Sequence, residues 1–169
     1  MIYEENDLQI DIPLEYKVKK HDDETNGLQC WKSVDFVVEL PDRTLFVEFK
    51  DPENPSIPDD KKNINDFITD KLLNDLSVKT RMSFLYEHAM DGAKKPVYYY
   101  IVIGLSALDD AIVIAQQDKL KERIPVMGPP GKKWKRKFIT DCGIFNIERW
   151  NRIFENIPIR RKSNSWNQT

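Results

Sequence analysis

The sequence predicts a single α/β (α+β) domain in which helices flank a central mixed β-sheet. Two neighbouring segments rich in Val and Phe, residues 33–40 and 44–50, are separated by a three-residue turn and predict a β-hairpin. An apolar, β-branched segment at 97–104 predicts a buried strand, and apolar residues recur at helical spacing on both sides of it. With 169 residues, of which 40% are hydrophobic, the chain is long enough for one core and too short for two ordinary ones.

The other elements follow from local patterns along the chain. Alternation in residues 1–26 predicts strand or irregular structure, and three prolines at 51–60 predict an ordered loop. Helical spacing predicts a long helix over 61–90, capped by Asp59 and Asp60 and with Ser77 as the candidate break point. A helix over 107–123, a short strand at 138–145 and a helix over 146–157 complete a domain of residues 1–157. Residues 158–169 show no pattern and are expected to form a mobile tail.

Composition excludes several classes of protein. No stretch approaches 18 apolar residues, so a membrane-spanning helix is not expected. The chain starts with acids where a secretory signal needs a positive and then an apolar segment, which predicts a cytoplasmic protein. Cys30 and Cys142 are far apart and form no CxxC pair, so we expect two buried thiols, with neither a disulfide framework nor a cysteine zinc site.

The net charge of −2 conceals two parts of opposite sign. Residues 1–118 hold 13 Lys and Arg against 24 Asp and Glu, whereas residues 119–169 hold 13 against 4. The basic residues are densest at 131–138 (the basic run), which is a candidate contact for nucleic-acid phosphates. The alternative explanation of the opposite charges is that they form two solvated faces that attract each other within the fold. The candidate nucleic-acid-binding residues of the run are Lys132, Lys133, Trp134, Lys135, Arg136 and Lys137.

Three charged residues interrupt the apolar hairpin. Asp35 lies in its first strand, and Glu48 and Lys50 share one face of the second, because side chains two apart in a strand point the same way. Two buried carboxylates need cations to balance them, and Lys50 can neutralise only one. A hard divalent cation, Mg²⁺ or Mn²⁺, would neutralise the remaining negative charge. It would also lower the pKa of a bound water, which could then attack a phosphodiester. A plain cross-strand ion pair between Asp35 and Lys50 is the alternative.

The arrangement of Asp35, a hairpin turn and then Glu48-Phe49-Lys50 resembles the PD-(D/E)XK phosphodiesterase superfamily. Residues 20–40 and 46–51 are also similar to uncharacterised bacterial members of this superfamily. The resemblance implies a restriction endonuclease-like αβββαβ core, with Asp35, Glu48 and the Phe49 carbonyl as metal ligands. It implies that Asp35, Glu48 and Lys50 are catalytic, with Lys50 positioning the water or offsetting charge. Members often carry a further acid before the first strand, for which the candidates are Glu15, Asp22, Asp23 and Glu24.

These observations together predict a divalent-metal-dependent nuclease that acts on DNA, with RNA as the other candidate substrate. Lys71, which forms a helical ladder with Asp75 and Lys79, is a candidate contact for the scissile phosphate, and a surface charge ladder is the alternative. No recognition module is evident in the sequence, so sequence specificity would need a homodimer or a protein partner. The alternatives are a catalytically silent nucleic-acid-binding protein, a protein-interaction module of the immunity or inhibitor type, and a hydrolase of small phosphate esters.

Overall fold

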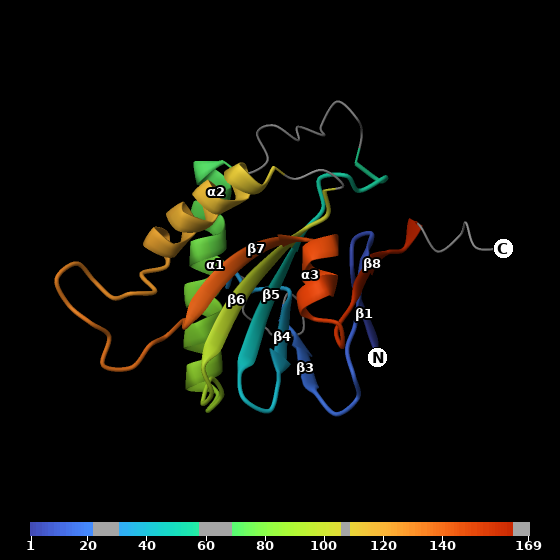
Figure 1. The fold of residues 1–169 in the computed structure, drawn as a ribbon. Coiled ribbons are helices and arrows are strands. Elements are labelled where there is room, and N and C mark those ends of the chain that lie inside the picture. Colours follow the sequence, from blue (N-terminus) through green and yellow to red (C-terminus); the bar gives the residue numbers. More distant parts are fainter. Residues whose placement is uncertain (22–30, 58–68, 106–108, 164–169) are drawn as a thin grey trace.

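The computed structural model describes residues 1–21, 31–57, 69–105 and 109–163, which adopt a mixed α/β fold. Within these ranges the strands form a five-stranded mixed sheet and a three-stranded antiparallel sheet, accompanied by three helices (Figure 1). In chain order the elements are β1 (Ile2–Glu5), β2 (Leu8–Asp11), β3 (Lys17–Lys20), β4 (Phe36–Glu39), β5 (Thr44–Lys50), α1 (Asp70–Ala89), β6 (Val97–Ile103), α2 (Asp110–Arg123), β7 (Asp141–Asn146), α3 (Ile147–Ile153) and β8 (Ile159–Arg161).

The five-stranded sheet runs in the order β3-β4-β5-β6-β7. Its first three strands form an antiparallel meander, whereas β6 is parallel to β5 and β7 is parallel to β6. The predicted hairpin is confirmed as β4 and β5, closed by a hydrogen bond from the Leu40 N–H to the Arg43 carbonyl (2.9 Å). The predicted strands at 97–104 and 138–145 are confirmed as β6 and β7, although β7 begins only at Asp141.

Hydrophobic cores lie on both faces of this sheet, which accounts for the largely apolar strands. In β4, Val37 packs with residues of α1 and α2, whereas the neighbouring Phe36 and Val38 belong to the core on the other face. That second face is covered by the three-stranded sheet and by α3, which supplies the fully buried Trp150 (Figure 1). A polar side chain of the hairpin that points toward α1 is therefore enclosed between two layers.

Helix α1 differs from the predicted helix in its start and in its continuity. It spans Asp70–Ala89 and is capped by Thr69, whose side chain accepts a hydrogen bond from a backbone N–H (3.2 Å). The predicted caps, Asp59 and Asp60, lie outside the described residues. The predicted break near Ser77 is wrong, because the Ser77 hydroxyl donates to the carbonyl three residues earlier and the helix continues through it.

The two later helices and one of the predicted thiols are confirmed. Helix α2 matches the prediction for 107–123 and is capped by Asp109, which accepts hydrogen bonds from two backbone N–H groups. Helix α3 is shorter than the predicted helix over 146–157 and ends at Ile153. Cys142 is buried, and burial raises the pKa of its thiol to about 12. Cys30 lies outside the described residues.

The predicted patternless tail is wrong for residues 158–163. Strand β8 pairs with β2, and Ile159 lies opposite Ile10 in the hydrophobic core. The Asn151 side chain also accepts from the Ile159 N–H (2.7 Å) and donates to its carbonyl (2.8 Å). A strand of three residues is too short to produce a recognisable alternation in the sequence. Residues 164–169 lie outside the described residues.

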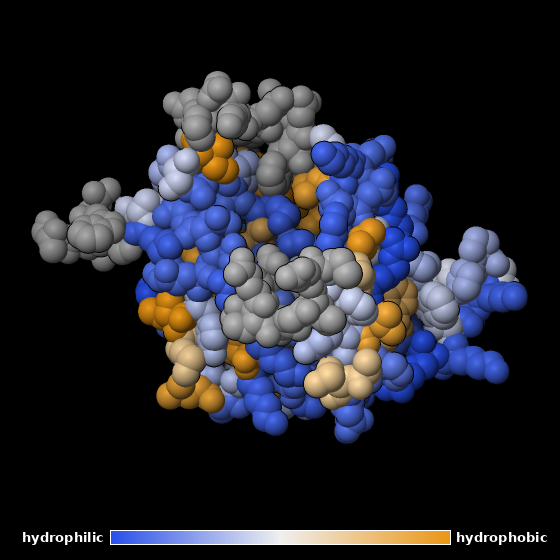
Figure 2. All heavy atoms as spheres, turned by 180° about the vertical axis from the view of Figure 1, so that it is seen from behind, coloured by the Kyte–Doolittle hydropathy of each residue, from blue (hydrophilic) through white to orange (hydrophobic). Residues whose placement is uncertain are grey.

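In the part of the chain that the structure describes, no helix is long and apolar enough to cross a membrane. The face opposite the view of Figure 1 is mostly hydrophilic, and its hydrophobic residues form separate patches (Figure 2). Exposed large apolar side chains include Leu14 in the β2–β3 turn, Met90 after α1 and Met127 before β7. Such scattered apolar side chains are ordinary on a protein surface.

Candidate active site

Asp35, Glu48 and Lys50 meet at the end of the β4–β5 hairpin that is far from its turn. Phe36 pairs with Val47, so the next cross-strand position places Asp35 opposite Glu48. Both carboxyl groups are buried beneath α1, with exposed fractions of 3% for Asp35 and 0% for Glu48. The prediction that these side chains share one face of the sheet is confirmed.

A fourth charged residue, Lys79 of α1, completes the group. Its Nζ lies 2.8 Å from Oε1 of Glu48 and 3.5 Å from Oδ1 of Asp35, so one ammonium bridges the two carboxylates. The Lys50 ammonium donates to the same Oε1 of Glu48 and to the Phe49 carbonyl (3.1 Å). We call Asp35, Glu48, Lys50 and Lys79 the charge cluster. With two carboxylates and two ammonium groups, its formal charge is balanced when all four are ionised.

The sequence pattern places Lys79 only in a helical charge ladder with Lys71 and Asp75 and does not predict its contact with the hairpin carboxylates. The buried side of α1 carries Leu76, Thr80 and Ser83, and Lys79 lies one helical turn from two of them. The Ser83 hydroxyl accepts a hydrogen bond from the Val34 N–H (2.9 Å), which fixes the helix against the backbone just before Asp35. A signal was therefore present, because a lysine among buried positions needs a buried anion as its partner.

Asp35 holds its proton more strongly than an ordinary aspartate. Burial raises the pKa of Asp35 to about 7, and the neighbouring Glu48 carboxylate adds to the increase, whereas Lys79 and Lys50 oppose it. A short hydrogen bond from the Phe49 N–H to Oδ2 of Asp35 (2.6 Å) also favours the ionised form.

Glu48 has one carboxylate oxygen without a hydrogen-bond partner in the described structure. Oε1 contacts both ammonium groups, whereas Oε2 is buried and unpaired. The same carboxylate adds to the effect of burial on Tyr99 of β6, whose pKa is raised well above its usual value. Since a buried, unpaired carboxylate oxygen is costly, Oε2 is the atom of the cluster at which a bound cation would gain most.

The donor atoms suit a hard divalent cation. Oε2 of Glu48, Oδ1 of Asp35 and the Phe49 carbonyl are oxygen donors of the kind that Mg²⁺ and Mn²⁺ prefer. Mg²⁺ commonly uses one or two carboxylates and keeps several waters, so two acids are sufficient in number. The Lys79 and Lys50 ammonium groups already contact both carboxylates and the Phe49 carbonyl, and they would compete with such a cation.

The described residues supply no larger acidic group. Among them, no cluster of three or more His, Cys, Asp or Glu side chains could hold a metal. Glu15, one candidate for an additional acid, is exposed. It precedes Lys17, which pairs with Glu39 at the end of β4 that is far from Asp35, so Glu15 lies away from the charge cluster. The other candidates, Asp22, Asp23 and Glu24, lie outside the described residues.

Lys71 lies apart from the charge cluster. It is exposed in the first turn of α1, two turns before Lys79. Asp75, between them on the helix, forms an ion pair with Lys32 (2.8 Å). Of the three charges in the predicted ladder, Lys79 alone contacts the hairpin carboxylates among the described contacts.

The basic run lies at the other end of the sheet. It leads into β7, and just before that strand the Thr140 N–H donates to the Val97 carbonyl (2.7 Å) at the start of β6. Val97 pairs with Thr44, the first residue of β5, whereas Lys50 is the last. The seven residues of β5 cover roughly 20 Å at about 3.3 Å per residue. The structure therefore does not bring the basic run to the charge cluster.

Trp134, at the centre of the basic run, is engaged within the fold. Its Nε1 donates to the Pro125 carbonyl (2.6 Å), and its ring makes an edge-to-face contact with Phe138. The basic side chains on either side of it are exposed. A contact between this run and nucleic acid stays a prediction, and the exposed residues that could make it are Lys132, Lys133, Lys135, Arg136 and Lys137.

A second buried ionic group holds α1 against the edge of the sheet. Glu87 of α1 lies 2.6 Å from Nε2 of His21 and 2.7 Å from Nζ of Lys19. Burial opposes ionisation of Glu87, but hydrogen bonds from His21 and Lys19 lower its pKa overall. The backbone N–H of His21 in turn donates to the Asp35 backbone carbonyl (3.0 Å), so this ionic group also fixes the backbone beside the charge cluster.

The backbone that follows Lys50 is tied to the C-terminal strand. Asp51 accepts two hydrogen bonds from the Arg161 guanidinium (2.8 and 3.1 Å), which also donates to the Gly104 carbonyl. The Gly104 N–H donates to the Lys50 carbonyl (2.7 Å). A Cβ at position 104 would lie 2.6 Å from Oδ1 of Asp51, so the close approach requires glycine. We call Asp51, Gly104 and Arg161 the clasp.

The charge cluster and the clasp therefore combine residues of β5, α1 and β8 with residues that directly precede β4 or follow β5 and β6, in one region of the fold. Comparisons of the chain with protein-family models, with curated proteins and with solved structures found no match.

Proposed function

We propose that the protein is a divalent-metal-dependent phosphodiesterase of the PD-(D/E)XK type that hydrolyses nucleic acid, with DNA favoured over RNA. The observation that carries the proposal is the position of Asp35 opposite Glu48 on one face of the hairpin, with Lys50 at the end of the same strand as Glu48. Two acids and a lysine in one partly enclosed site are the groups that metal-assisted attack on a phosphodiester needs.

The order of the elements supports the same proposal. The meander β3-β4-β5, the helix α1 and then β6 parallel to β5 follow the βββαβ part of the core that the resemblance implies. Asp35 comes just before the second of these strands, and Glu48 and Lys50 end the third. The implied first helix has no counterpart in residues 1–21, which form β1, β2 and β3.

Asp35, Glu48 and the Phe49 carbonyl would hold the cation. When bound, Mg²⁺ or Mn²⁺ supplies an acidified water and a positive charge beside the phosphate. The partly exposed Lys50 ammonium can orient that water and offset negative charge on the phosphate oxygens. Without the cation Asp35 has a pKa of about 7, and it must be ionised to act as a ligand, so binding of the cation should release a proton near neutral pH.

Lys79 favours a second candidate function, a catalytically silent protein on the same fold. Its ammonium bridges Asp35 and Glu48 and balances the charge of the cluster without a metal ion. In that case the four charges hold the hairpin to α1 and perform no chemistry. The two candidates differ in whether a divalent cation can displace the Lys79 ammonium from the carboxylates.

A cleavage assay tests the proposal. Wild type, Lys50→Ala and the control Lys94→Ala are incubated with single-stranded and duplex DNA and RNA in Mg²⁺, Mn²⁺ or EDTA. Lys94 pairs with the exposed Asp91, so its loss should leave turnover unchanged. We expect wild type to cut at least one of these substrates only with the cation, and Lys50→Ala to be slower by on the order of 10²-fold.

Two results would contradict the proposal. Cleavage that persists in EDTA, or that is equally fast in Lys50→Ala, would mean that the charge cluster takes no part in the reaction. No cleavage of any substrate, combined with a large loss of thermal stability in Lys50→Ala and no stabilisation of wild type by Mg²⁺, would establish the silent alternative.

A further inference from the structure

We propose that Arg149 and Arg152 of α3 bind a phosphate group of the nucleic-acid chain whose scissile phosphate lies at the charge cluster. This inference rests on the proposed function and names the surface that positions its substrate. The site is a pocket of about 210 Å³ at the carboxyl end of β7, between α2 and α3. Its lining consists of Asp110, Val113, Ile144, Asn146, Glu148, Arg149 and Arg152.

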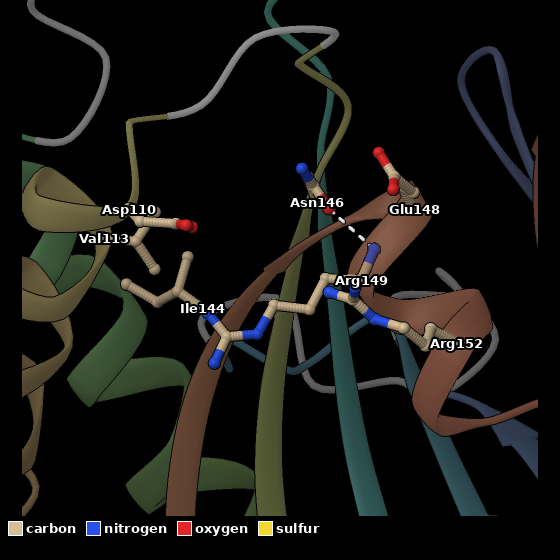
Figure 3. Close-up of a pocket in the computed structure, with 7 residues that line it drawn as sticks. All are labelled: Asp110, Val113, Ile144, Asn146, Glu148, Arg149 and Arg152. Atoms are coloured by element: carbon tan, nitrogen blue, oxygen red, sulfur yellow. Dashed lines mark hydrogen bonds between the residues drawn. The ribbon is translucent and has the colours of Figure 1, made fainter.

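Both arginines are positioned to receive an anion. Figure 3 shows the Arg149 side chain extended across β7 toward Ile144, with the Arg152 guanidinium pointing in the same direction. The Asn146 side chain fixes the start of α3 by accepting from the Arg149 N–H (2.7 Å). In the same view the Glu148 carboxylate points away from both guanidinium groups.

Neither guanidinium forms an ion pair or a hydrogen bond among the described residues; the Arg149 guanidinium lies over the Phe145 ring, with Cζ 5.8 Å from the ring centroid. By contrast, Arg123 pairs with Asp70 and Arg161 pairs with Asp51. A guanidinium has a planar set of donors that matches two oxygens of a phosphate, so two unpaired arginines in one polar pocket form a phosphate site. The Asp110 carboxylate stands on the opposite wall, which assigns the phosphate to the arginine side of the pocket.

The pocket and the charge cluster lie at the same edge of the sheet. Lys50 pairs with Ile103, and Ile103 pairs with Asn146, so the three residues form one row across β5, β6 and β7. Two strand spacings of about 4.8 Å separate Lys50 from Asn146 by roughly 10 Å. A nucleic-acid strand of a few nucleotides is long enough to cover a separation of this size.

The pocket lies beside the edge strand β7, between α2 on one face of the sheet and α3 on the other. Its wall residues Val113 and Ile144 belong to the core between the sheet and helices α1 and α2, which is the face that carries Asp35 and Glu48. A nucleic-acid strand could therefore pass from Lys50 along the carboxyl ends of β5, β6 and β7 and reach, at the edge strand, the arginines that α3 supplies from the other face. The basic run, at the opposite end of β5, lacks this continuity.

Binding without catalysis tests the inference. Fluorescence anisotropy of labelled single-stranded and duplex DNA is measured in EDTA for wild type, for Arg149→Gln with Arg152→Gln, and for Lys132→Gln with Lys133→Gln. The two double variants remove the same number of positive charges from opposite ends of the sheet. Tryptophan fluorescence, to which the buried Trp150 contributes, reports whether each variant is folded.

We expect the arginine variant to bind at least about tenfold more weakly than wild type, which is the scale of one charge-assisted contact. Its log–log salt slope should be smaller by about 0.7–0.9 for each phosphate contact that is lost. The lysine variant should lose less affinity. Asp110→Asn should bind more tightly, because it removes the negative charge from the pocket.

Three outcomes would overturn the inference: unchanged binding by the folded arginine variant, equal losses in the two double variants, or weaker binding by Asp110→Asn. The cleavage assay separates this failure from failure of the proposed function. Metal-dependent cleavage that is unaffected in the arginine variant would leave the function and remove the phosphate site. Arginine-dependent binding without cleavage by wild type would leave the site and remove the function.

Discussion

Replacement of Asp35 by Asn tests the electrostatics of the charge cluster. The Asn amide keeps an oxygen in place of Oδ2, which accepts the Phe49 N–H at 2.6 Å, and removes one of the two buried carboxylates. Lys50 and Lys79 then face a single carboxylate, that of Glu48. The substitution therefore changes the charge of the cluster with little change in its shape.

The expected magnitude follows from the pKa of Asp35. That pKa is about 7 in the folded protein and 3.8 for the ordinary side chain. Because the folded state binds the proton more readily, this group lowers the free energy of unfolding as pH rises from about 4 to about 7. A difference of about 3 in pKa corresponds to a loss on the order of 4 kcal/mol. The Asn variant lacks this titration and should lose much less stability over the same window.

The assay is urea unfolding in EDTA at about pH 5 and about pH 8, on the two sides of this window, with tryptophan fluorescence as the signal. We expect the free energy of unfolding of Asp35→Asn, relative to wild type, to be higher at the upper pH by about 2–4 kcal/mol. Asp91→Asn is the control, because Asp91 is an exposed acid in a surface pair. Parallel pH dependences for wild type and Asp35→Asn would refute the reasoning.

Three further predictions concern the contacts around the cluster. Lys79→Met should lower the free energy of unfolding by about 3 kcal/mol, because it leaves two buried carboxylates with Lys50 alone, and thermal melting should show a drop of roughly 6–12 °C. Gly104→Ala should lower the free energy of unfolding by about 1–3 kcal/mol, since its Cβ would lie 2.6 Å from Oδ1 of Asp51. An unchanged denaturant midpoint would mean that the side chains of the clasp move aside without cost. Asn151→Ala removes two hydrogen bonds to β8 and should make the C-terminal strand more sensitive to limited proteolysis than in wild type; equal cleavage rates would contradict its role.

The sheet was predictable because its strands carry strong local signals. The β4–β5 hairpin and β6 are dense in Val, Phe and Tyr, and both of their faces are buried, so apolar residues run through them almost without interruption. The same density made Asp35 and Glu48 visible, because each carboxylate interrupts an apolar strand. Strand periodicity placed Glu48 and Lys50 on one face, and the short hairpin turn brought Asp35 beside them.

Lys79 and β8 were not predictable in the same way, because both depend on long-range packing. Lys79 lies among ordinary helical charges, and its partners are 44 and 31 residues away in the sequence. Strand β8 has three residues and is stabilised by β2, near the other end of the chain. The basic run illustrates the converse, because composition marks it clearly while the sheet places it far from the charge cluster.

The central claim is that Asp35 and Glu48 hold a divalent cation in preference to the Lys79 ammonium. Calorimetric titration of Mn²⁺ and Mg²⁺ into wild type and into Glu48→Gln, which removes the carboxylate with the unpaired buried oxygen, measures this directly. We predict saturable binding at one site in wild type and its loss in Glu48→Gln, while Glu53→Gln, outside the cluster, binds as wild type does. The absence of saturable heat in folded wild type, or equal binding by wild type and Glu48→Gln, would contradict the claim.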